Sequence, residues 1–241
     1  MSTQYKENGW DAVPVDPSNI FHGSPFIHTP TALLVSEIAF PHDDHVVEKI
    51  YNHAREKLPR QTLNHSMRVY YYSAAILRQQ FPESAISPST LALTCLLHDI
   101  GTAKDILTGS RMSFEFSGAI HAHQTLVDSG APQDQADAVC EAIIRHQDLG
   151  TEGTITLLGQ VIQLATIFDN VGEHPTMNGI ASLLHEDTWK GVVGEFPREG
   201  WLGCFAATIR EEVKLKPWCH STHIPRFAEK IEGNELMKPY E

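Results

Sequence analysis

Residues 94–101 read Thr-Cys-Leu-Leu-His-Asp-Ile-Gly and place two metal-binding side chains, His98 and Asp99, next to each other. Neighbouring residues in a helix point about 100° apart, so such a pair converges on one ion only where the helix ends. Gly101 is the residue most able to let the backbone turn away at that point. The alternative is a pair of solvated polar residues at a helix terminus.

His65 and Asp169 offer the same donor types elsewhere in the chain. Asp169 follows a strongly apolar stretch, where a carboxylate at a helix C-terminus opposes the helix dipole unless a cation binds it. A buried His or Asp at a helix end needs a group that satisfies it. For His65 the alternative is a hydrogen-bonded histidine of the core or the surface. His65, His98, Asp99 and Asp169 are therefore the candidates for one metal site.

Composition narrows the class of protein. The chain has 241 residues, which suits one well-filled domain, and no apolar stretch approaches the roughly 20 residues that a membrane helix needs. The first ten residues are polar and lack the apolar region of a signal peptide, so we expect a cytoplasmic protein. A formal charge of −12 with scattered basic residues argues against a nucleic-acid partner and against a membrane surface.

The elements that must position these residues are helices. Apolar residues recur with helical spacing, and no stretch alternates as a strand does. The expected helices cover residues 43–58, 62–81, 88–98, 113–129, 132–148, 155–168, 186–193 and 198–213. The fold class is therefore all-α, with a helical body at 43–213 between irregular arms at 1–42 and 214–241. Such arms often pack across subunits, which suggests a homo-oligomer.

Local signals define the helix ends. Thr62 and Thr154 are the expected caps of two helices, and Ser87-Pro88 supplies a cap and a first-turn proline for the helix that ends at His98. Gly130 closes the helix that starts near Ser113.

The order His65, His98-Asp99, Asp169 resembles the HD-domain superfamily, in which this motif surrounds a divalent metal within a helical bundle. Further segments are similar to the fungal cyanamide hydratases and cover nearly the whole chain. These segments are 8–15, 64–69, 94–99, 112–115, 142–148, 169–172, 216–218 and 236–239. The resemblance implies that 43–213 is an HD domain, that the four candidates bind the metal, and that the protein is an enzyme.

The resemblance also implies the reaction, which is hydration of cyanamide, a small neutral nitrile, to urea at a zinc ion. Imidazole and carboxylate ligands suit zinc, and also iron or manganese. A zinc-bound hydroxide would attack the nitrile carbon while an acid protonates the nitrogen. Asp99 is the candidate for orienting or relaying the water proton, and a purely ligating role is the alternative. His146 is the second catalytic candidate; its alternative is a structural histidine at a helix terminus.

Four residues are candidates for substrate binding: Arg68, Phe114, Glu115 and Asn170. Arg68 could neutralise Asp99 or Asp169, or lie on the surface like most arginines. Glu115 could orient a ligand imidazole, or serve as an ordinary acid in the first turn of a helix. Phe114, together with Trp218, could shape a tight, dry pocket, or belong to the core.

The main alternative function is an HD-type phosphohydrolase that acts on a nucleotide or phosphate ester. Dinuclear members add histidines between the His-Asp pair and the last Asp, and His121 or His123, with His146, could supply them here. His121 and His123 do not share a helix face, so at most one could join. The basic cluster that a phosphate favours is absent from the sequence around the motif. A non-enzymatic scaffold with a structural metal ranks third.

Overall fold

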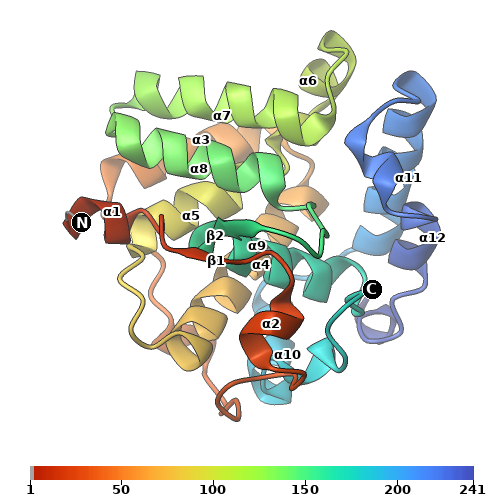
Figure 1. Ribbon diagram of the computed structural model, residues 1–241. Helices are drawn as coiled ribbons and strands as arrows, with labels where there is room; N and C mark the ends of the chain where they lie inside the picture. Colours follow the sequence, from red (N-terminus) through yellow and green to blue (C-terminus); the bar gives the residue numbers. More distant parts are fainter. Residues whose placement is uncertain (1–2) are drawn as a thin grey trace.

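The computed structural model describes residues 3–241, and its regular structure is almost all helical, which confirms the predicted fold class (Figure 1). The helices are α1 (Thr3–Glu7), α2 (Pro17–Phe21), α3 (His45–Lys57), α4 (Arg60–Gln80), α5 (Pro88–Leu97), α6 (Lys104–Gly109), α7 (Phe114–Ser129), α8 (Gln133–Arg145), α9 (Leu157–Asn170), α10 (Glu186–Glu195), α11 (Trp201–Leu215) and α12 (Phe227–Glu232).

One small sheet corrects the expectation that the chain has no strands. β1 (Ala12–Pro14) pairs antiparallel with β2 (Thr154–Thr156), and Ala12 lies opposite Thr156. Each strand has three residues. Such segments are too short for an alternating pattern to be visible in the sequence. The sheet fastens the N-terminal arm to the segment that leads into α9.

Helix ends follow local signals where a side chain can cap the helix. Ser87 accepts a hydrogen bond from the backbone N–H of Thr90, and Gly130 ends α7 with a φ of 96°, so both predictions are confirmed. The caps predicted at Thr62 and Thr154 are wrong. α4 already begins at Arg60, after Pro59. α9 begins only at Leu157, so its cap is Thr156, which accepts a hydrogen bond from the backbone N–H of Gly159.

The centre of the molecule is α5, whose residues from Thr90 to Leu97 are all buried. α4 packs against α5 and against α9, every residue of which is buried. α7 and α8 form an antiparallel pair that lies side by side across the top of Figure 1, while α11 and α12 stand together at its right edge. This packing brings the start of α4 and the ends of α5 and α9 together at the core.

Both arms pack on the helical body. Phe21 and Phe40 of the first arm and Met237 of the second are buried in the same apolar core as α4, α5 and α9. Within the described part of the chain, no helix combines the length and the apolar character that crossing a bilayer requires. The division into an HD domain at 43–213 and two arms, and the homo-oligomer that the arms suggest, stay predictions.

Candidate metal centre

The His-Asp pair lies where α5 ends. His98 is the C-terminal cap residue of α5, and Asp99 leaves the helix with φ −102° and ψ 10°. Gly101 is needed for a different reason from the one expected, since its φ is not positive. A Cβ at this position would lie 1.9 Å from the carbonyl oxygen of Phe114. Glycine therefore lets the first turn of α7 rest directly on the His-Asp turn.

Three of the four predicted ligands converge. The Nε2 atoms of His65 and His98 are 3.1 Å apart, and Asp99 Oδ2 lies 3.6 Å from the first and 3.3 Å from the second. All three side chains are at most 1% exposed. Neither carboxylate oxygen of Asp99 has a hydrogen-bond partner among the described residues. A buried carboxylate without donors is costly, and a cation between these three groups would remove that cost.

The Nδ1 atoms of His65 and His98 form hydrogen bonds that orient both rings, so that their Nε2 atoms face Asp99. His98 Nδ1 donates to the carbonyl oxygen of Cys95 at 2.8 Å, and His65 Nδ1 pairs with Asp169 Oδ2 at 2.6 Å. Burial lowers the pKa of His65 to about 4, so its imidazole is neutral at pH 7. His65 Nε2 therefore carries a lone pair that can bind a metal. Burial would lower the pKa of His98, but Asp99 outweighs it and raises this pKa, so His98 Nε2 has to release its proton when a metal binds. This arrangement, with Nδ1 held by an oxygen, is typical of histidines that bind metals.

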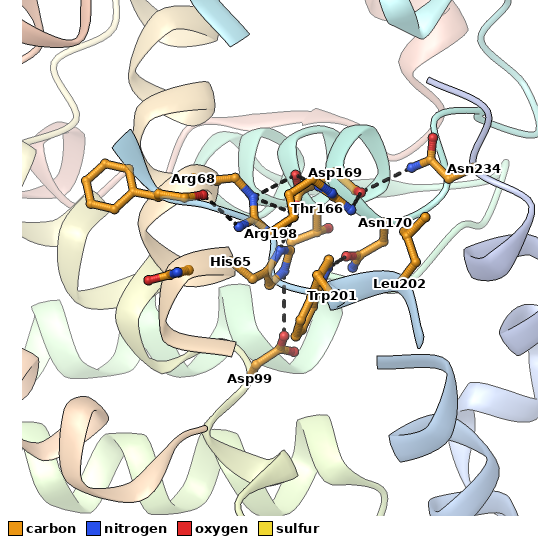
Figure 2. Close-up of polar contacts among 12 residues, drawn as sticks. His65, Arg68, Asp99, Thr166, Asp169, Asn170, Arg198, Trp201, Leu202 and Asn234 are labelled. Carbon is orange, nitrogen blue, oxygen red and sulfur yellow. Dashed lines mark hydrogen bonds and ion pairs between the residues drawn. The ribbon is translucent and has the colours of Figure 1, made fainter. Parts of the chain in front are cut away.

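Asp169 lies on the other side of the His65 ring, as Figure 2 shows. Its carboxylate accepts hydrogen bonds from Arg68 Nη2 at 2.8 Å and Arg198 Nη1 at 2.5 Å. Burial would raise the pKa of the Asp169 carboxyl, but Arg198, Arg68 and His65 hold it well below its usual range. Its role as a fourth metal ligand stays a prediction. The structure shows it as the partner of His65 Nδ1 and of two arginines.

Arg68 is fully buried, so the alternative of a surface arginine is wrong. Asn170 Oδ1 accepts a hydrogen bond from Trp201 Nε1 at 2.8 Å (Figure 2). The ring of Trp201 stacks on His65 with 4.3 Å between centroids and 15° between planes. Arg68 and Asn170 thus act on the His65 side of the site, the first through Asp169 and the second through Trp201.

His146 lies on the other flank of Asp99. Its Nε2 is 4.0 Å from Asp99 Oδ1, and its Nδ1 donates to the carbonyl oxygen of Ile143. Burial lowers the pKa of His146, which leaves the imidazole neutral with an acceptor nitrogen toward Asp99. The rings of Phe114 and His146 are 5.9 Å apart, edge to face. The structure therefore brings both predicted residues to the centre.

Glu115 is fully buried in the first turn of α7, where its Oε1 pairs with His220 Nδ1 at 2.7 Å. Trp218 does not shape a dry pocket, because it is 60% exposed. The two histidines of the dinuclear alternative lie elsewhere. His121 contacts His53 through the Nε2 atoms at 3.1 Å, and His123 pairs with Asp137 at the surface.

Sequence reasoning missed three residues that complete the site: Arg198, Trp201 and His220. All three come from the last quarter of the chain, from α11 and the segments on either side of it. Arg198 was expected to lie in the first turn of a helix after Pro197. The helix instead begins at Trp201, after Gly200 with a φ of 79°. None of the three has a local signal that marks it as functional.

Comparisons with known proteins agree with the geometry. The HD domain family matches residues 62–171, a range that contains His65, His98, Asp99 and Asp169. Two proteins of Saccharomyces cerevisiae, named cyanamide hydratase DDI2 and cyanamide hydratase DDI3, are each 41% identical to the chain over 196 residues. The matched region covers 80% of this chain and 84% of each relative.

Proposed function

Because the chain belongs to the cyanamide hydratase family of HD-domain proteins, we propose that it hydrates cyanamide to urea at one zinc ion held by His65, His98 and Asp99. The observation that carries this proposal is the Asp99 carboxylate, which is buried without a hydrogen bond beside the Nε2 atoms of two imidazoles.

The donor set fits a catalytic zinc ion. Two histidines and one carboxylate are a common set of three protein ligands, and they leave a further coordination position for water or substrate. Iron or manganese would fit the same donors. A divalent metal bound there supplies Lewis acidity and lowers the pKa of water to near neutrality. An open position also distinguishes this centre from a structural metal site.

The residues around the centre can move the proton that the reaction requires. Hydration forms a bond between a water oxygen and the nitrile carbon, breaks one π bond of the nitrile, and delivers a proton to its nitrogen. Asp99 Oδ1 and His146 Nε2 are the acceptors on one flank of the centre, 4.0 Å apart. We assign the proton transfer to this pair. The isourea that forms then tautomerises to urea.

The charges around the centre favour a neutral substrate over a phosphate ester. The two arginines beside the site, Arg68 and Arg198, are both fully buried and both bound to the Asp169 carboxylate. A phosphate would have to take one of them from Asp169 or remain unpaired in a buried site, which is costly. Cyanamide is small and neutral and needs neither arginine. A homo-oligomeric, cytoplasmic enzyme remains part of the proposal.

Purified enzyme loaded with zinc should therefore convert cyanamide to urea and leave p-nitrophenyl phosphate and nucleoside monophosphates unchanged. Urea and released phosphate are measured in parallel on the same preparation. Phosphate release without urea would contradict the hydratase function and favour the phosphohydrolase alternative.

We expect one metal ion per chain. The described residues bring a single group of three His or Asp donors within 4.8 Å of one another, and His121 and His123 lie outside it. Elemental analysis of purified protein gives both the element and the stoichiometry. Two ions per chain, with one lost in His146→Ala, would instead assign a dinuclear centre.

A further inference from the structure

The C-terminal arm supplies part of the site. Its segment 216–223 (the C-terminal strap) crosses the start of α7 through a row of hydrogen bonds. Lys216 Nζ donates to the carbonyl oxygen of Met112 at 2.7 Å, and Trp218 Nε1 donates to that of Arg111 at 2.9 Å. The backbone N–H of His220 donates to Ser113 Oγ at 2.9 Å. These bonds fix the position of the strap against residues 111–113, which lead into α7.

The strap ends on Glu115. His220 Nδ1 pairs with Glu115 Oε1 at 2.7 Å, and the imidazole stacks with Phe116 and with His223, with centroid distances of 5.5 and 4.1 Å. The His220 side chain is 28% exposed, whereas Glu115 is fully buried. His220 therefore holds one oxygen of a carboxylate that solvent does not reach.

The second carboxylate oxygen of Glu115 is not bound by His220. Its Oε2 is buried and has no hydrogen-bond partner among the described residues, and the same holds for Gln147 Oε1 beside His146. Glu115 follows Phe114, which rests on Gly101 and contacts the ring of His146. The Glu115 carboxylate is also near enough to His146 for its charge to act on the imidazole. Two unfilled acceptors therefore belong to the chain neighbours of Phe114 and His146, the two rings that meet at the centre, and a ligand with N–H donors would satisfy them.

We propose that Glu115, held by His220 of the C-terminal strap, accepts a hydrogen bond from the amino group of the substrate and makes the enzyme selective for amino-substituted nitriles. This inference rests on the proposed hydratase function. Cyanamide differs from acetonitrile, which is similar in size, by an amino group in place of a methyl group. A site built to bind an N–H group discriminates strongly against an analogue without one, because the buried acceptor is then left unpaired.

The test compares cyanamide, as substrate, with acetonitrile, as competitive inhibitor. In Glu115→Gln the amide oxygen keeps the bond to His220, and a donor NH₂ replaces the free acceptor, with nearly unchanged volume. We expect the KM for cyanamide to rise about 10- to 100-fold, the loss typical of a hydrogen bond to a charged group. The inhibition constant of acetonitrile should stay nearly constant. Glu141→Gln, at an exposed acid of α8, is the matched control.

His220 is tested as a positioning residue. His220→Ala should raise the KM for cyanamide more than it lowers kcat, because the free Glu115 side chain loses its fixed orientation. His220→Asn should return the KM most of the way to the wild-type value, since its amide N–H can donate to Glu115 from the place of Nδ1. Metal content is measured for every variant and should not change.

The outcomes separate the inference from the proposed function. If Glu115→Gln left the ratio of the KM for cyanamide to the inhibition constant of acetonitrile unchanged, the inference would be overturned. Urea formation by the wild-type enzyme would still uphold the hydratase function. A wild-type enzyme that forms no urea would overturn both.

Discussion

Replacing Asp99 with alanine is expected to abolish urea formation and to remove the bound metal. Asp99 is the only carboxylate within the group of three donors found among residues 3–241, and its Oδ2 lies 3.3 Å from His98 Nε2 and 3.6 Å from His65 Nε2. Two neutral imidazoles alone bind zinc much less tightly than a set that includes a carboxylate. The variant should also be less stable. At a free metal concentration of 100 times the Kd, metal binding adds about 2.7 kcal/mol to the free energy of unfolding.

The measurement combines three readouts on Asp99→Ala: urea formation, metal content, and the unfolding temperature with added zinc or with chelator. The wild-type unfolding temperature should depend on zinc, and that of the variant should not. Asp105→Ala is the matched control, since Asp105 pairs with Lys57 at the surface a few residues later. An Asp99→Ala protein that retains stoichiometric metal would show that the ligand assignment is wrong.

The helical scaffold could be predicted because its signals are local. Ser87-Pro88 and Gly130 act on their own backbone neighbours, so they can be identified without knowing the fold. The placement of His98 and Asp99 at the end of a buried helix follows in the same way. The error at the start of α9 has a long-range cause. Thr154 and Thr156 can both cap a helix, but residues 154–156 pair with β1, so the helix begins only at Leu157.

The rest of the site depends on contacts between distant parts of the chain. Arg198 looks like a surface arginine in the sequence, but a carboxylate 29 residues earlier holds it in the core. His220 lies 105 residues from Glu115, and Trp201 lies 136 residues after His65, on which it stacks. Gly101 was assigned to a backbone turn, whereas its true constraint is the carbonyl oxygen of Phe114. Hydrophobic periodicity and capping residues carry no information about contacts between residues so far apart in the sequence.

Asp169→Ala should destabilise the fold more than any single surface change and should also abolish urea formation. The carboxylate is the shared partner of Arg68 and Arg198, and all three side chains are fully buried. Removing one member of a buried ion-pair network leaves the others uncompensated, which typically costs about 3–5 kcal/mol. His65 would lose the acceptor of its Nδ1 hydrogen as well, so its ring would no longer be fixed toward Asp99 and His98.

Denaturant unfolding, urea formation and metal content test this prediction, with Asp137→Ala as control, because Asp137 pairs with His123 at the surface. Full metal occupancy and full activity in Asp169→Ala would contradict it. Asp169→Asn then separates the two roles of the carboxylate. A direct ligand role predicts loss of the metal. Support of His65 through Nδ1 alone predicts an affinity lowered by about 10- to 100-fold, because an asparagine oxygen can still accept that hydrogen.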